Sequence, residues 1–254
     1  MGLIENLKSY AEGVQISGEK KELFTSFMSK GFPTTKDEEW KYTSLKKIVT
    51  KDYTIENTGE IIDSSTVEKY SLGFDNRIIF SDGKLIRSPN IKGVSVNGFS
   101  NFGSNTTDSI LQLNKALAQN GFTISVDKNT VLESPIEILF FSTTENNFSQ
   151  YRNLISVGDN TEVKFVERIQ ALNDSTSMVN NFTQINCAKN TKVEYNKIQN
   201  NTPESRLIDT VNVYQEQDST CDINTLIFGG SFTRNNLNFE QNGSNCESNM
   251  NGIS

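Results

Sequence analysis

The chain has no histidine in its 254 residues. This absence excludes a Ser-His-Asp or Cys-His nucleophilic centre, and any metal site with a histidine ligand, within the chain. No apolar run approaches the roughly 20 residues of a membrane span. The first residues, MGLIENLKSYAEG, lack the basic and apolar regions of a signal peptide. We therefore expect a cytoplasmic protein with no membrane partner.

Cysteine and positive charge are also scarce. The three cysteines, Cys187, Cys221 and Cys246, all lie in the second half, and an odd number fits a reducing compartment better than a disulfide framework. Lysine and arginine total 24 against 31 acidic residues, a net charge of −7, which argues against nucleic acid as a partner. With 35% hydrophobic residues, the chain is predicted to fold into one large domain or two modest ones.

The sequence predicts an N-terminal region over residues 1–120 that contains helices and some strands. Apolar residues recur at helical spacing in 3–14 and 23–28, and Gly31 with Pro33 is a plausible stop for the second helix. We also predict a short helix over DEEWKYTSLKKI (37–48) and an amphipathic helix over DSILQLNKALAQN (108–120). Between them, NRIIF and KLIRS flank Ser81-Asp82-Gly83, which is a hairpin signal.

The C-terminal half contains an internal repeat with a period of about 30 residues. Its copies are NTEVKFVERIQ (160–170), NTKVEYNKIQN (190–200), TCDINTLIFGG (220–230) and a degenerate NCESNMNGIS (245–254). Small or apolar residues alternate with polar ones, as in half-buried strands. The predicted inward columns are Thr161, Thr191, Cys221 and Cys246; Val163, Val193, Ile223 and Ser248; and Phe165, Tyr195, Thr225 and Met250.

The outward positions indicate the same register. If the copies stack in parallel, Glu162 lies beside Lys192, Lys192 lies beside Asp222, and Lys164 lies beside Glu194. Opposite charges then alternate, whereas like charges side by side would be destabilising. Each exposed pair contributes only about 0–1 kcal/mol, so the pattern is a sign of register and not a source of stability.

Each repeat also has a second strand before the turn, and two strands per repeat describe one coil of a β-solenoid. A β-sandwich could supply short strands, but it would not place matching columns 30 residues apart. The predicted fold is mainly β, with a solenoid over 121–254 after the mixed region 1–120. Because the chain stops at NGIS inside an expected coil, we expect a fragment of a longer protein, or an end that pairs with something.

GFPTTKDEEWKYTSL (31–45) resembles the N-terminal signature of the SufB/SufD family of iron–sulfur cluster assembly scaffolds, most closely its SufD members. The matching positions are Gly31, Phe32, Pro33, Thr34, Glu38, Trp40, Lys41, Tyr42, Thr43 and Leu45. Three further segments are similar to the family in the same order: GFTISVDKNTVLESPIEILFF (121–141), YRNLISVGDNTEVKFVER (151–168) and FGGSFTRNNLNFEQNGSNCESNMNG (228–252).

The resemblance implies an N-terminal helical region followed by a right-handed parallel β-helix. It also implies a non-catalytic scaffold with SufB-like and SufC-like partners. In the family, the complex assembles an iron–sulfur cluster and uses ATP through SufC, so no cofactor is expected in this chain. A homodimer through the β-helix is a further expectation. Family members continue to a helical C-terminal region with a Lys-Cys-Ser-His-Gly segment and the SufC contact, which this sequence lacks. We therefore expect this chain to be a fragment that lacks the region that contacts SufC.

No catalytic, cofactor-binding or metal-binding residue is assigned. Cys221 and Cys246 share a predicted column and could form a sulfur-accepting or cluster-ligating pair, but small buried cysteines are the simpler interpretation. Cys187 falls on the other strand, and a cluster usually needs four ligands. Trp40 could belong to a partner surface. An aromatic anchor among solvated charges is the favoured interpretation.

Two other motifs favour structure over chemistry. Adjacent helical residues such as Glu38 and Glu39 do not face each other, so they are poor acid–base partners. Gly229-Gly230 with Arg234 precedes a strand and not the helix that a phosphate loop requires, so a tight turn is predicted. Two alternatives stay open: a polysaccharide lyase or hydrolase on a parallel β-helix, and a self-assembling structural solenoid.

Overall fold

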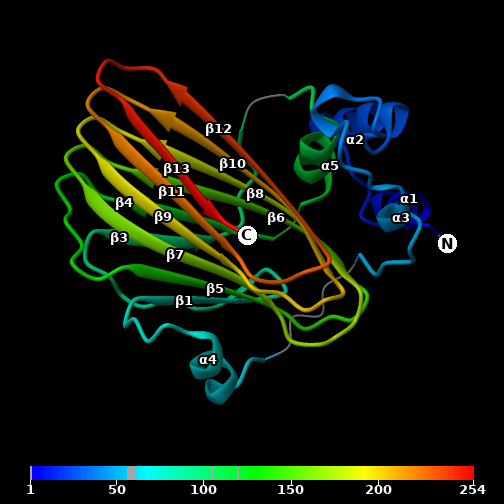
Figure 1. Cartoon of the computed structure of the whole chain (residues 1–254), viewed down its shortest axis with the longest axis horizontal. Helices are drawn as coiled ribbons and strands as arrows, with labels where there is room; N and C mark the ends of the chain where they lie inside the picture. Colours follow the sequence, from blue (N-terminus) through cyan, green and yellow to red (C-terminus); the bar gives the residue numbers. More distant parts are fainter. Residues whose placement is uncertain (1, 56–60, 104–105, 119) are drawn as a thin grey trace.

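Two β-sheets face each other in a parallel β-solenoid of about five turns, with helices on the outside (Figure 1). The computed structural model describes residues 2–55, 61–103, 106–118 and 120–254. The helices are α1 (Leu3–Gly13), α2 (Gly18–Lys30), α3 (Lys46–Val49), α4 (Ser64–Tyr70) and α5 (Ser109–Leu117), with a 3₁₀ turn at Glu38–Trp40. None of these helices is long and apolar enough to cross a membrane.

The strands alternate between the two sheets along the chain. A seven-stranded sheet has the order β13-β11-β9-β7-β5-β1-β2, and a six-stranded sheet has the order β12-β10-β8-β6-β4-β3. The predicted mainly β solenoid with N-terminal helices is therefore confirmed. The strand bounds are β1 (Arg77–Ser81), β2 (Lys84–Arg87), β3 (Val94–Gly98), β4 (Phe122–Val126), β5 (Ile136–Ser142), β6 (Phe148–Val157), β7 (Glu162–Ala171), β8 (Ser177–Cys187), β9 (Lys192–Gln199), β10 (Ser205–Gln215), β11 (Thr220–Ile227), β12 (Phe232–Gln241) and β13 (Glu247–Ile253).

The predicted hairpin is confirmed and has a second role. Strands β1 and β2 pair antiparallel around Asp82 and Gly83, whose φ angles of 44° and 82° suit a tight primed turn. Strand β1 also pairs in parallel with β5, and β3 pairs with β4. Both sheets thus contain strands from either side of the predicted boundary at residues 120 and 121, and that boundary stays a prediction.

The predicted helix over 37–48 is wrong as a continuous element. The chain instead forms the 3₁₀ turn and, after an irregular stretch, α3. In an α-helix the Glu39 carbonyl would accept from the amide of Thr43. Here it accepts from Arg234 Nη2 at 2.7 Å, and the Thr43 amide donates to the Trp40 carbonyl. A tertiary contact therefore replaces the helical hydrogen bond.

One turn of every coil carries a residue in the left-handed region. Asn129, Asn160, Asn190, Asp218 and Asn245 all have φ between 56° and 61°, a conformation that asparagine and aspartate tolerate better than most residues. Side-chain hydrogen bonds join three of the four neighbouring pairs, with Asn160 Nδ2 donating to Asn129 Oδ1 at 3.0 Å, and Asn190 Nδ2 donating to Asn160 Oδ1 and Asn245 Nδ2 donating to Asp218 Oδ1, both at 2.9 Å. These bonds connect equivalent turns of successive coils.

The predicted register is correct for the first pair of repeats and wrong for the later ones. Val163 lies beside Val193, 30 positions later, as predicted. Val193 then lies beside Cys221, 28 positions later, and Cys221 beside Ser248, 27 positions later. The predicted columns are therefore offset by two residues. A two-residue offset keeps every side chain on its face of the sheet, so alternation alone could not detect it.

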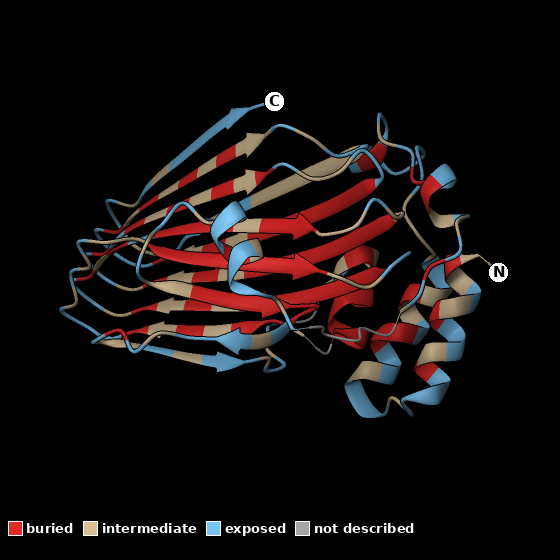
Figure 2. Cartoon of the chain, turned by 90° about the horizontal axis from the view of Figure 1, so that it is seen from below, coloured by how far each residue is buried: buried red, intermediate tan, exposed pale blue. Residues whose placement is uncertain are grey.

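The helices cover the outer faces of the two sheets unequally. α1, α2 and α5 pack with Trp40 over the six-stranded sheet, contacting Phe148, Met178 and Ile208. The short helix α4 lies on the opposite side of the molecule, over β1 and β5 (Figure 1). Burial is deepest in the middle of the solenoid, whereas β13 is largely exposed (Figure 2).

Candidate functional site

Trp40 is an anchor between the N-terminal region and the solenoid. Its side chain is only 4% exposed, and the guanidinium of Arg234 on β12 lies 4.0 Å from its ring centroid. The same guanidinium donates to the Glu39 carbonyl and to Thr43 Oγ1. Glu38 and Glu39 stay exposed beside it. The predicted anchor role is confirmed, and its partner Arg234 was not foreseen.

The glycines before Arg234 lie in a short connection between two strands, and the predicted tight turn stays a prediction. Gly229 and Gly230 lie in the connection between β11 and β12, and a strand follows them. The chain therefore places no helix N-terminus behind these glycines, which is what a phosphate loop would need.

The prediction that Cys221 and Cys246 are neighbours in one column is wrong. Cys221 lies beside Val193 and Ser248 in the ladder. Cys246 precedes β13 and lies 3.9 Å from Ser219 Oγ. The cause is the two-residue offset, which puts Cys246 in the column of Thr191 and Ser219 and not in that of Cys221.

Cys221 instead faces Cys187 inside the solenoid, and both thiols are buried. A hydrogen bond with Cys187, together with burial, raises the pKa of the Cys221 thiol far above its ordinary range. Because the thiolate is the nucleophile and the metal ligand, a thiol held protonated is poorly reactive. The geometry agrees with the interpretation of these residues as small buried side chains.

A cluster of charged side chains lies inside the solenoid. Lys197 Nζ on β9 is 3.4 Å from Glu167 Oε1 on β7, and it also pairs with Asp209 Oδ2 on β10. All three side chains are at most 1% exposed. Tyr195 Oη donates to Glu167 Oε2 at 2.6 Å. Two carboxylates therefore share one ammonium group in the interior.

The surroundings of Glu167 in this cluster favour its protonated form. Burial raises the pKa of Glu167, as does the charge of Asp209, while Lys197 opposes the rise. The two carboxylates and the hydrogen bonds raise the pKa of Lys197 despite its burial. Gln199 and Asn181 donate to the two oxygens of Asp209, at 2.9 and 3.1 Å. The cluster is thus held together by hydrogen bonds as well as by charge.

Sequence reasoning missed this cluster, although the signal was available. The inward-facing residues of β9, Val193 and Tyr195, are followed two positions later by Lys197. On β7, the inward-facing Val163 and Phe165 are followed in the same way by Glu167. Extending the alternation by one step would have placed two opposite charges inside the solenoid. The contribution of Asp209 could not be found in this way, because it comes from the other sheet.

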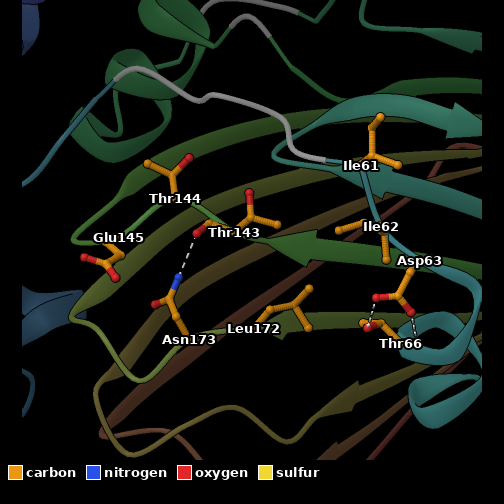
Figure 3. A pocket seen from close by; sticks show the side chains of 9 residues that line it. All are labelled: Ile61, Ile62, Asp63, Thr66, Thr143, Thr144, Glu145, Leu172 and Asn173. Carbon is orange, nitrogen blue, oxygen red and sulfur yellow. Dashed lines mark hydrogen bonds between the residues drawn. The ribbon is translucent and has the colours of Figure 1, made fainter.

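An open groove of about 580 Å³ lies between the segment before α4 and the loops after β5 and β7 (Figure 3). Thr143 and Thr144 donate from their hydroxyls to the buried Asp82, which fixes the loop after β5. Asn173 Nδ2 donates to the Thr143 carbonyl at 2.8 Å. The lining residues are Ile61, Ile62, Asp63, Thr66, Thr143, Thr144, Glu145, Leu172 and Asn173.

The chemistry of this groove suits binding better than catalysis. Hydrogen bonds from Ser65 and Thr66 hold the pKa of Asp63 below its ordinary range, so this carboxylate stays ionised and is a poor general acid at neutral pH. Ile61 is 92% exposed at the rim. The described residues contain no group of three or more cysteine, aspartate or glutamate side chains that could hold a metal ion.

Strands β12 and β13 each form one edge of a sheet, and β3 and β2 form the other edges. Met250 continues the inward column of Tyr195 and Ile223 but is 59% exposed, and Phe228 and Ile253 are also exposed. An edge strand presents unpaired backbone groups that another strand can bind.

Two family models match the chain. Residues 7–73 match the SufBD protein N-terminal region, and residues 140–254 match the SufBD core domain of SUF system FeS cluster assembly. Together the two matches cover more than half of the chain. The first includes Trp40, and the second begins in β5 and includes the solenoid strands that follow.

A curated relative is the iron–sulfur cluster assembly protein SufD of Escherichia coli (strain K12). It is 25% identical over 259 residues, an alignment that covers 96% of this chain and 60% of the relative. The chain therefore spans about 60% of the length of the relative it matches.

Proposed function

Because this chain belongs to the SufBD family of the SUF iron–sulfur cluster assembly system, we propose that it is a non-catalytic, SufD-like scaffold subunit. The observation that carries the proposal is the order of the two family matches, first the N-terminal region and then the core, on a fold that is itself an N-terminal helical region followed by a β-solenoid. In this proposal the iron–sulfur cluster is cargo, and the complex works in the cytoplasm.

The proposed partners are a SufB-like and a SufC-like subunit. The SufB-like subunit binds the β-solenoid, and the match of this region to the core domain of the family supports this choice of surface. The SufC-like subunit hydrolyses ATP, so this chain needs no nucleotide site of its own. Its role is to position partners.

Co-purification tests the proposal. The 254-residue chain and the full reading frame of its gene are each expressed with the tagged SufB-like subunit from the same genome, with and without the SufC-like subunit. We expect both forms to recover the SufB-like subunit, and only the longer form to recover the SufC-like subunit. If the longer form recovered neither the SufB-like nor the SufC-like subunit, the scaffold role would be refuted. Equal SufC recovery by both forms would refute only the predicted loss of the SufC contact.

The non-catalytic part of the proposal has its own test. The purified chain is assayed alone for ATP hydrolysis and for cleavage of pectin-like polymers with added calcium, with the SufC-like subunit as the positive control for ATP hydrolysis. We expect no turnover by this chain in either assay. Measurable polymer cleavage would favour the β-helix lyase alternative and would contradict the proposal.

A further inference from the structure

Arg152 is buried on the outer face of the six-stranded sheet. It is 3% exposed and packs against two neighbouring aromatic rings, with its guanidinium carbon 4.3 Å from the ring centroid of Phe182 and 4.9 Å from that of Phe102. Phe182 is its neighbour on β8, whereas Phe102 belongs to the segment before α5. The two rings therefore hold the guanidinium in one position.

Two of the three guanidinium nitrogens of Arg152 donate to described residues. Nε donates to the Phe102 carbonyl at 3.0 Å and Nη1 donates to Asn114 Oδ1 at 3.1 Å. Nη2 donates to no described residue. It faces Gly103, where a Cβ atom would stand only 2.7 Å from Nη2, so the glycine lets the backbone pass close to the guanidinium.

No carboxylate of the described residues forms an ion pair with Arg152. The nearby acid Glu19 accepts from Lys115 Nζ at 2.6 Å and acts on Arg152 only from a distance. Burial lowers the pKa of Arg152 to about 10, so the group stays charged at neutral pH. A buried cation without a counterion is costly, because aromatic and amide contacts replace only part of its hydration.

A small cavity lies beside this cation. Its volume is about 200 Å³, and it is lined by Gly103, Thr106, Leu111, Arg152, Phe182, Gln184, Asn212 and Tyr214. The Asn212 side chain accepts from Asn238 Nδ2 at 2.9 Å, and its own Nδ2 donates to no described residue. The Tyr214 hydroxyl likewise has no described partner. Two unused neutral donors therefore line the cavity together with the buried cation.

We propose that this cavity is a binding site for a small inorganic oxyanion of the phosphate class. The anion supplies the counter-charge that Arg152 lacks and accepts hydrogen bonds from Arg152 Nη2, Asn212 Nδ2 and the Tyr214 hydroxyl. Charge-assisted bonds from a guanidinium to phosphate oxygens are among the stronger hydrogen bonds in proteins. The site lies beside Gly103 and Thr106 on the outer face of the six-stranded sheet and does not depend on the iron–sulfur role.

The donor arrangement favours a tetrahedral anion over a carboxylate. Arg152 uses Nε and Nη1 for protein contacts and has only Nη2 to offer, so two-pronged pairing is not available to either anion and the other hydrogen bonds must come from donors in other directions, which the four oxygens of a tetrahedral anion can accept. The other donors come from β10, on the far side of Phe182. The volume corresponds to about seven waters, which is too small for a nucleotide or other drug-sized ligand.

Equilibrium dialysis with radiolabelled inorganic phosphate at constant ionic strength tests the proposal on the 254-residue chain. We expect saturable binding of one phosphate per chain, with sulfate competing at least tenfold better than acetate. Absence of saturable binding would overturn the proposal. Acetate competing as well as sulfate would overturn the assignment to a tetrahedral anion.

Asn212→Asp is the decisive variant, because it keeps the acceptor for Asn238 but places a negative charge in the cavity. We expect at least a tenfold loss of phosphate affinity. The matched control is Asn129→Asp in a turn of the solenoid, where Asn129 Oδ1 likewise accepts from an asparagine, Asn160, at 3.0 Å and Asn129 Nδ2 donates to no described residue. The control should bind as the parent does. Equal binding by the parent and Asn212→Asp would place the anion elsewhere and refute the site.

Arg152→Gln removes the cation but could also unfold the chain, so Tyr214→Phe is the companion variant. It removes one hydroxyl that has no protein partner and should lower phosphate affinity several-fold with an unchanged melting temperature in phosphate-free buffer. A melting temperature that falls without any loss of binding would show that Tyr214 is structural and would remove it from the site.

Discussion

Strands β7 and β9 carry two sets of ion pairs, one outside and one inside the solenoid. The distances between the charged atoms are nearly equal in the two sets, but the burial of the side chains is very different. On the outside, Lys192 lies 3.4 Å from Glu162, and the four side chains of the two outer pairs are 31–61% exposed. On the inside, Lys197 lies 3.4 Å from Glu167, and both are 1% exposed. Solvent screens the outer pairs and leaves each worth about 0–1 kcal/mol. The comparison shows that equal geometry does not mean equal energy.

The interior cluster is not a simple gain in stability. Two carboxylates and one lysine are removed from water, at a cost that mutual attraction only partly offsets. The hydrogen bonds from Tyr195, Gln199 and Asn181 are therefore part of what makes the burial tolerable. Removing one member should cost far more than removing its counterpart outside, and four measurements test this difference.

Lys197→Met should have the largest effect. It leaves Glu167 and Asp209 buried without a cation, and breaking a buried pair in this way costs about 3–5 kcal/mol. Urea unfolding followed by circular dichroism measures the loss, with Lys192→Met as the matched control on the same strand. A loss below about 1 kcal/mol for Lys197→Met would mean that burial does not separate the two sets of ions.

Tyr195→Phe should have the next largest effect. It keeps the ring but removes the donor to Glu167 Oε2, and an unsatisfied buried acceptor costs about 1–3 kcal/mol. Tyr214→Phe is the control, since its hydroxyl has no partner among the described residues. If the two variants lost equal free energy of unfolding, the hydrogen bond to Glu167 would not be supporting the cluster.

The pH dependence should separate the two sets as well. The pKa of Glu167 is raised in the folded state, so between the unfolded value near 4.5 and the folded value the native chain binds more protons than the unfolded chain. This contribution to stability is full below the unfolded pKa and is lost as pH rises through the folded pKa.

We therefore expect the free energy of unfolding to fall with rising pH in that window, relative to Glu167→Gln, by up to about 1.4 kcal/mol per pH unit. Urea titrations at several pH values measure the difference. Glu162→Gln, on the outer face, is the comparison variant and should leave the pH profile close to that of the parent. Parallel curves for the parent and Glu167→Gln would contradict the raised pKa.

Lys192→Met should have the smallest effect, about 0–1 kcal/mol. This loss should shrink further in 1 M salt, because the Debye length there is about 3 Å. The loss for Lys197→Met should change little with salt, since buried pairs are screened much less. Thermal unfolding in low and high salt measures both, and equal salt sensitivity of the two variants would remove the distinction between them.

Much of the fold could be predicted because its signals are local. The apolar spacing in α1 and α2, the turn at Asp82-Gly83 and the alternation in β7 and β9 all arise within a few residues. The short helix at 37–48 was overpredicted because the competing hydrogen bond comes from Arg234, which is distant in the chain. No local pattern could reveal that competition.

The candidate site was less predictable for a related reason. The charged cluster joins two strands of one sheet with Asp209 from the other, and the phosphate-class cavity joins the segment before α5 with three strands of the solenoid. Such groups meet only after the coils have closed. Their sequence neighbours are ordinary strand residues, so no motif marks them.

By itself the sequence determined which side of each strand faces inward, because side chains alternate with a period of two, and it determined the family through the stretch around Trp40. Only the tertiary structure decided the register beyond β9, because alternation cannot distinguish an offset of two residues. The tertiary structure also decided which charges are buried. Lys192 and Lys197 lie five positions apart on one strand, and opposite faces of the sheet give them different surroundings.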